Sequence, residues 1–96
     1  EHTLRRLGKM KDRFPVIGDI RGRGLLLGVE LVRPDHPMEP DADSARQIAV
    51  AALKQGVILL ASGRAGNVIS LTPPLTITKE QLDFALGVLE DCLARL

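Results

Sequence analysis

The sequence predicts a small α+β domain in which a mostly antiparallel sheet carries helices on one face. Three segments, near the start, the middle and the end of the chain, repeat apolar residues at helical spacing. Between them, four shorter apolar stretches are bounded by glycine or proline, as strands usually are. The expected order is therefore α-β-β-α-β-β-α. At 96 residues, the chain has the length of one domain, so we expect residues 1–96 to form a single unit.

The first helix is expected to end before Phe14 and Pro15, because proline disfavours the α conformation in the residue before it. Strands follow at about 16–21 and 24–32, and they are joined tightly or through a bulge at the glycine-containing residues 22–24. Residues 33–40 contain three prolines, so we expect an exposed loop there.

A second helix is predicted by an apolar stripe that ends before Gly56. The stripe comprises Ala45, Ile48, Ala49, Ala52 and Leu53. Its start has three capping candidates, Asp41, Asp43 and Ser44, the last with Gln47 three residues later, and the sequence leaves the choice open.

Two more strands are expected at residues 57–60 and 68–72, separated by a loop at 61–66. In the later strand, Ile69 and Leu71 share one face, and Ser70 lies on the other. A pair of prolines at 73–74 ends this strand. The last helix is expected to start with the capping box Thr78-x-x-Gln81.

The composition excludes several classes of function. The only aromatic residues are Phe14 and Phe84, so the core must be aliphatic and a base-stacking surface is absent. A net charge of +1 with interspersed signs predicts no nucleic acid partner and no membrane partner. The single Cys92 forms no internal disulfide and is expected to be buried and inert, which fits a reducing, cytoplasmic location. The chain starts inside an apparent helix without Met, so we expect it to be the tail of a longer protein.

The residues alone indicate no self-contained catalytic machinery. The spacing Gly22-x-Gly24-x-x-x-Gly28 departs from the dinucleotide fingerprint and leads into a strand, where that motif needs a helix. His2 and His36 are isolated, and no acidic, His or Cys cluster has metal-ligand spacing. The lysines all occupy polar helix or cap positions. We therefore expect no catalytic, cofactor-binding or metal-binding residue in this chain.

Three blocks nevertheless resemble the C-terminal small domain of class III pyridoxal-phosphate aminotransferases, the group of 4-aminobutyrate, ornithine and acetylornithine aminotransferases. They are the glycine-spaced run 17–31, the helix end and strand at 54–60, and residues 66–82 with their two prolines. The resemblance implies a fold type I enzyme, usually a homodimer, whose large domain supplies the Schiff-base lysine and holds pyridoxal 5'-phosphate. The small domain would then form one wall of the substrate cleft.

Ser70 is the informative departure from that family. Many members have an arginine at this position, where its planar fork can hold a substrate carboxylate. A neutral hydroxyl cannot replace that charge, so carboxylate recognition of this type is in doubt. Ser70 either lines the cleft of an enzyme with another substrate class or is an ordinary polar strand residue, and Arg64 in the preceding loop is a candidate to compensate.

The resemblance thus implies an enzyme that transfers an amino group from an amine or amino acid to a 2-oxo acid. Its partners would be a large domain, a second subunit of a homodimer and a small amine or amino-acid substrate. The 96-residue chain alone should be inactive. The alternative is a stand-alone, non-catalytic α+β interaction module.

Overall fold

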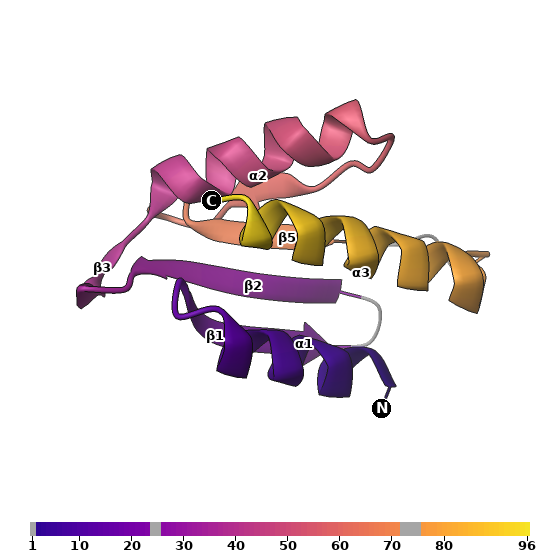
Figure 1. Ribbon diagram of the computed structural model, residues 1–96, viewed down its shortest axis with the longest axis horizontal. Helices are drawn as coiled ribbons and strands as arrows, with labels where there is room; N and C mark the ends of the chain where they lie inside the picture. Colours follow the sequence, from indigo (N-terminus) through magenta and orange to yellow (C-terminus); the bar gives the residue numbers. More distant parts are fainter. Residues whose placement is uncertain (1, 24–25, 72–75) are drawn as a thin grey trace.

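The computed structural model describes residues 2–23, 26–71 and 76–96, and within them it contains helices and strands in the order α-β-β-β-α-β-β-α (Figure 1). The elements are α1 (His2–Arg13), β1 (Ile17–Arg23), β2 (Leu26–Arg33), β3 (His36–Pro40), α2 (Ala42–Lys54), β4 (Leu60–Ser62), β5 (Val68–Leu71) and α3 (Lys79–Ala94). The α+β class predicted from the sequence is confirmed. The prolines at 73–74 and residues 24–25 lie outside the described residues.

The sheet has the strand order β1-β2-β5-β4, and β3 pairs with β2 away from this path. Every described pair of strands is antiparallel. The helices lie side by side in the order α1, α3, α2 along one face of the sheet (Figure 1). The predicted arrangement of helices on one face is therefore confirmed, and the other sheet face carries no helix among the described residues.

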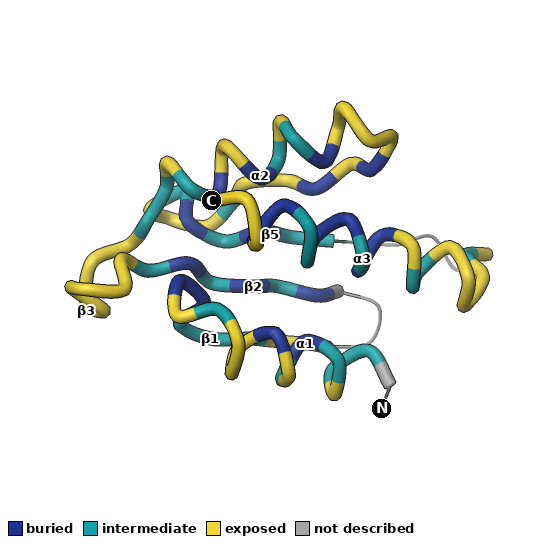
Figure 2. The backbone as a smooth tube through the Cα atoms, in the orientation of Figure 1, coloured by how far each residue is buried: buried dark blue, intermediate teal, exposed yellow. Residues whose placement is uncertain are grey.

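The core between the helices and the sheet is aliphatic, as the composition predicts. Figure 2 shows where the buried residues lie along the backbone. Phe14 is only half-buried at its edge, and Phe84 is exposed. The buried apolar residues are Leu7, Met10, Val16, Ile17, Leu27, Val29, Leu31, Ala45, Ile48, Ala52, Val57, Leu59, Ile69, Ala85, Leu86, Val88, Leu89, Cys92 and Leu93.

The expectation of a plain loop at residues 33–40 is wrong, because β3 occupies His36–Pro40. This strand forms an exposed hairpin with β2, in which Val32 faces Pro40 and Arg33 faces His36 with a register shift between the two pairs. All five residues of β3 are exposed. An edge strand of this kind tolerates proline, because its missing N–H removes no bond from the interior of the sheet.

Two strand details also differ from the expectation. The strand predicted at 57–60 begins only at Leu60, because pairing with β5 starts there. Residues 22–23 pair regularly with β2 as far as the pair Arg23–Leu26, which agrees with the tight join and not with a bulge there; the register shift between β1 and β2 lies at residues 17–19. Gly18 sits in that irregularity, where an added Cβ would approach the Cγ1 of Val32 to 2.8 Å. A larger residue at position 18 would therefore require the Val32 side chain to shift.

The helix ends follow the capping signals of the sequence. Asp41 is the cap of α2, since its carboxylate accepts a hydrogen bond from the Ser44 backbone N–H at 3.0 Å. After α2, Gly56 adopts a φ of 85°, which favours glycine. The capping box predicted for α3 is confirmed, with Thr78 and Gln81 bonding to each other's backbone N–H groups at 3.0 Å.

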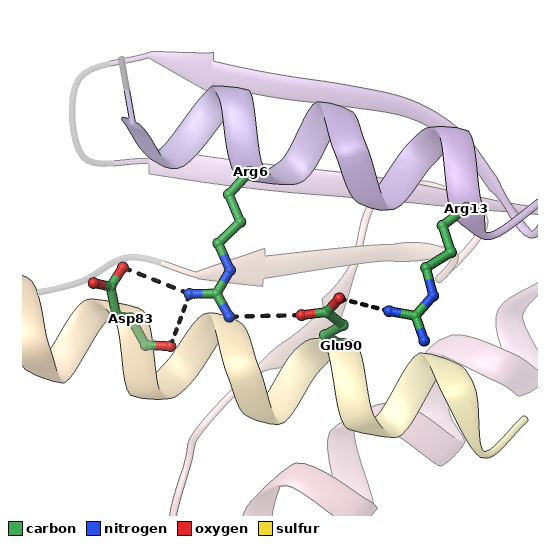
Figure 3. A network of polar contacts seen from close by, with 4 residues as sticks. All are labelled: Arg6, Arg13, Asp83 and Glu90. Carbon is green, nitrogen blue, oxygen red and sulfur yellow. Dashed lines mark hydrogen bonds and ion pairs between the residues drawn. The ribbon is translucent and has the colours of Figure 1, made fainter.

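The first and last helices are joined by charged side chains, as Figure 3 shows. Arg6 of α1 donates a hydrogen bond to the backbone carbonyl of Asp83 at 3.2 Å and lies 3.6 Å from the carboxylates of both Asp83 and Glu90. Arg13 bonds to Glu90 at 2.8 Å. These groups are partly exposed, so each pair contributes little stability, but together they fix how α1 lies against α3.

Asn67 is the only buried polar residue among the described part of the chain, and it links β5 to β2. The side-chain amide of Asn67 donates to the backbone carbonyl oxygen of Leu31 at 2.8 Å. The backbone carbonyl of Asn67 accepts from the Leu31 N–H at 2.8 Å. The Leu31 carbonyl also accepts from the Asp41 N–H at 3.0 Å. The Asn67 side chain thus ties the start of β5 to the end of β2, and the Leu31 carbonyl that it bonds to also holds the residue before α2.

Replacing Asn67 by alanine is expected to lower the free energy of unfolding by about 1–3 kcal/mol, because a buried side-chain hydrogen bond is lost. Urea unfolding followed by circular dichroism measures the change. The exposed amide Gln47 provides the control, and Gln47→Ala should change stability by less than about 0.5 kcal/mol. Equal effects of the two substitutions would show that the Asn67 bond does not contribute.

Candidate functional site

An open groove of about 660 Å³ lies where the start of α3 meets β4, the end of β5 and the segment after α2. Most of its surface comes from apolar side chains, with a few polar ones among them. The lining residues are Gly56, Val57, Ile58, Leu60, Ser70, Leu71, Ile77, Glu80, Gln81 and Phe84.

Three large apolar side chains of this groove are exposed to solvent. Ile58 is 69% exposed, Leu60 59% and Phe84 60%. Single exposed apolar residues are common on soluble proteins, but a group of them around one concave surface marks a place that contacts a ligand or another protein surface. We therefore take the groove as the candidate site.

Ser70 lies in this groove, on the sheet face opposite the buried Ile69, as the alternation of β5 predicts. It pairs with Gly28 of β2 on one side and Leu60 of β4 on the other. Its hydroxyl lies 2.5 Å from the hydroxyl of Ser62, which is also 3.3 Å from the Val68 carbonyl oxygen. Ser70 is thus half-buried and held by its neighbour.

Arg64, the second residue singled out from the sequence, lies elsewhere. It is exposed in the segment between β4 and β5 and lines another hollow, of about 460 Å³, together with Arg21 and Glu30. The structure therefore does not bring Arg64 and Ser70 into one cavity. A compensating role for Arg64 stays a prediction.

Arg21, which lines the same hollow as Arg64, has its charge matched locally. Its guanidinium lies 3.3 Å from the carboxylate of Asp19 and 3.3 Å from that of Glu30. The backbone N–H of Ile20 and, after it, the Arg21 side chain hold the pKa of the Asp19 carboxyl below its usual value. This exposed cluster is a surface ion-pair group, and it leaves Arg21 poorly placed to bind a further anion.

The described residues do not form a site for pyridoxal phosphate. Lys9, Lys11, Lys54 and Lys79 are all exposed, and none of them lines the groove around Ser70. That groove also lacks arginine among its described lining residues, so it offers a phosphate group no cationic partner.

Other chemistry is equally absent from the part of the chain that the structure describes. Cys92 is buried, and burial, followed by the nearby Asp91 carboxylate, raises the pKa of its thiol, so it is an inert core residue as predicted. No group of His, Cys, Asp or Glu residues in the described ranges could hold a metal ion. Among the same residues, no helix is sufficiently long and apolar to cross a membrane.

Sequence reasoning missed Ser62 and the exposed apolar groove. Ser62 was placed in a loop, and its contact with Ser70 depends on the register in which β4 pairs with β5. Phe84 was an unassigned aromatic residue in the last helix. Phe84 lies outside the helical spacing that buries Ala85 and Leu86, which was the available signal that its side of α3 does not face the core.

Comparisons with known proteins agree on a family. The family model described as aminotransferase class-III matches residues 1–93. An alanine/serine racemase from Pyrococcus horikoshii is 43% identical over 94% of the chain and 19% of the relative. A 4-aminobutyrate aminotransferase from Mycobacterium leprae is 44% identical over 92% of the chain and 20% of the relative. The chain spans about a fifth of the length of these curated relatives.

Solved structures give the same result. A phospholyase from Arthrobacter in complex with phosphoethanolamine superimposes with a TM-score of 0.91 and 32% identity, over 96% of this chain and 22% of that one. A Bacillus anthracis aminotransferase superimposes with a TM-score of 0.85 and 35% identity, over 97% of this chain and 22% of that one. The fold and the sequence therefore point to one group of enzymes.

Proposed function

Since the chain belongs to the class III aminotransferase family, we propose that it acts as the C-terminal small domain of a pyridoxal-phosphate enzyme. The enzyme would transfer an amino group from an amine or amino acid to a 2-oxo acid. The family match over residues 1–93 and the fraction of each relative that the chain spans support this proposal. A larger partner domain would then hold the cofactor, which supplies the amino-group chemistry when bound.

The observation that carries the proposal is the exposed apolar groove around Ser70. A groove that leaves Ile58, Leu60 and Phe84 exposed is suited to face a substrate cleft or a partner surface, because contact there removes apolar area from water. The chain itself would contribute one wall of the cleft and no catalytic group. We further propose a homodimeric enzyme in the cytoplasm, where the single Cys92 stays reduced.

A second candidate activity is racemisation or epimerisation of amino acids within the same family. It is favoured by an alanine/serine racemase, a leucine/methionine racemase and an isoleucine 2-epimerase at 42–44% identity. Such a reaction inverts one carbon of the substrate and needs no 2-oxo acid. The two activities therefore separate in a simple assay.

The test uses the full-length protein that carries this sequence, together with the 96-residue chain. The full-length protein with pyridoxal phosphate should convert an amino donor and a 2-oxo acid into the new amino acid, which chiral chromatography detects. Appearance of the opposite enantiomer from a single amino acid without oxo acid would instead establish the racemase. The short chain should show neither activity and should not retain the cofactor after dialysis.

The chain's lysines provide the control for the test of pyridoxal phosphate retention. If the short chain did retain pyridoxal phosphate, and Lys54→Ala or Lys79→Ala abolished retention, the proposal that another domain holds the cofactor would be overturned. A full-length protein that neither retained pyridoxal phosphate nor showed either activity would instead favour a non-catalytic interaction module.

A further inference from the structure

The hydrogen bonds around Ser62 determine which way the Ser70 hydroxyl points. A serine hydroxyl has one hydrogen to donate and two lone pairs to accept with. The Val68 carbonyl, 3.3 Å from the Ser62 oxygen, can only accept, so the Ser62 hydroxyl donates its hydrogen bond to that carbonyl. The 2.5 Å contact between the Ser62 and Ser70 oxygens fits a donor on either side, and with the Ser62 hydrogen on the Val68 carbonyl it is Ser70 that donates. In that arrangement Ser70, which lines the groove, has only its acceptor lone pairs left for a ligand.

The other polar groups of the groove strengthen this polarity. Glu80 carries a carboxylate, which accepts hydrogen bonds and repels anions. The side-chain oxygen of Gln81 already accepts the capping-box hydrogen bond from the Thr78 N–H. Apart from Ser70, the neutral amide N–H groups of Gln81 are the only side-chain donors among the described lining residues. No lining residue that the structure describes is cationic. The groove thus combines an apolar surface with an excess of acceptors and a negative charge.

We infer that this groove binds an aliphatic group that ends in a hydrogen-bond donor, a hydroxyl or an ammonium, and that it discriminates against a carboxylate. Ser62 is the positioning residue, because it orients the Ser70 hydroxyl as an acceptor. As a statement about substrates, the inference rests on the proposed function. It names the part of the substrate that would lie against the small domain: a neutral or cationic end, with any carboxylate held elsewhere.

Binding to the chain tests the inference without cofactor or oxo acid. The ¹⁵N-labelled chain is titrated with 1-pentanol, pentylammonium and pentanoate, which share a length and differ in the end group. The backbone amides of Leu60, Ser70 and Phe84 should shift with the alcohol and the ammonium. Pentanoate should bind about three- to tenfold more weakly, the effect expected for losing one hydrogen bond.

Two variants separate the hydroxyl orientation from simple charge repulsion. In Ser62→Ala, the Ser70 hydrogen is free to point into the groove, so the difference between 1-pentanol and pentanoate should shrink by about threefold. In Glu80→Gln, a difference should persist. Ser44→Ala, which removes a hydroxyl from the start of α2, is the matched control and should leave the discrimination unchanged.

The outcomes are decisive in either direction. Equal binding of pentanoate and 1-pentanol, or no shift of the groove amides with any probe, would overturn the inference. Loss of all discrimination in Glu80→Gln with none lost in Ser62→Ala would overturn the role of Ser62. Because these measurements need no amino transfer, an inactive full-length protein that still shows the binding pattern would contradict the proposed function and leave the groove chemistry standing.

Discussion

Replacing Leu31 by alanine is expected to lower the free energy of unfolding by about 3–5 kcal/mol, the usual cost of a cavity at a fully buried leucine. Leu31 has 0% exposed area and lies on β2, in the interior of the sheet order β1-β2-β5-β4. Its backbone is also tied to Asn67 on both its N–H and its carbonyl. The main chain is thereby held in place, which limits how far the structure can collapse into the cavity.

The control for Leu31→Ala is a leucine that the same substitution should barely affect. Leu53 on α2 is 62% exposed, so Leu53→Ala should cost less than about 1 kcal/mol. Urea unfolding of both variants gives the comparison. For a chain of this size the Leu31 loss is a large part of a total stability of about 5–15 kcal/mol. Similar losses in the two variants would contradict the assigned core.

Leu53 also shows where the periodicity of a sequence misleads. It is the last member of the stripe that predicts α2, and it was expected to face the core. Ala45, at the start of the stripe, is buried. Leu53 lies eight residues later, and at about 100° per residue its side chain points about 80° away from the direction of Ala45. Leu53 has therefore rotated away from the sheet. The stripe predicts the helix correctly and overstates the length of its buried face.

The elements that local chemistry determines were predictable. The capping box at Thr78, the helix end before Pro15 and the alternation of β5 each depend on residues close together in the sequence, and all three are confirmed. The choice of Asp41 among three possible caps depends on a path that β3 and the Leu31 carbonyl define. The bond that places Asp41 joins it to Leu31, ten positions earlier, so the sequence alone left the choice of cap open.

The candidate site also has features that one strand determines and features that depend on how strands pair. Ser70 could be placed on the open face of its strand, because alternation within one strand is local. Its contact with Ser62 could not be found, because β4 starts later than the apolar run suggests and the register between two strands cannot be read from either one. The separation of Arg64 from Ser70 follows from the same register. The chemistry of the groove is thus a tertiary property.

Replacing Ser70 by arginine in the full-length protein is expected to raise kcat/KM for a substrate with a carboxylate at the small-domain end by about 10- to 100-fold relative to its alcohol analogue. Hydrogen bonds to charged groups are worth about 1.5–3 kcal/mol each, and a guanidinium can form two of them with one carboxylate. The groove supplies room for the larger side chain and has no cation of its own among its described lining residues. Steady-state kinetics with paired substrates measures the change.

Glu80 sets the limit of the Ser70→Arg effect, because its carboxylate lines the same groove and competes for the new guanidinium. The double change Ser70→Arg with Glu80→Gln should therefore favour carboxylate substrates more than Ser70→Arg alone. Ser70→Gln adds size without charge and is the matched control, so it should leave the preference near its original value. An unchanged substrate profile in all of these variants would mean that Ser70 is an ordinary strand residue and that the substrate does not reach this groove.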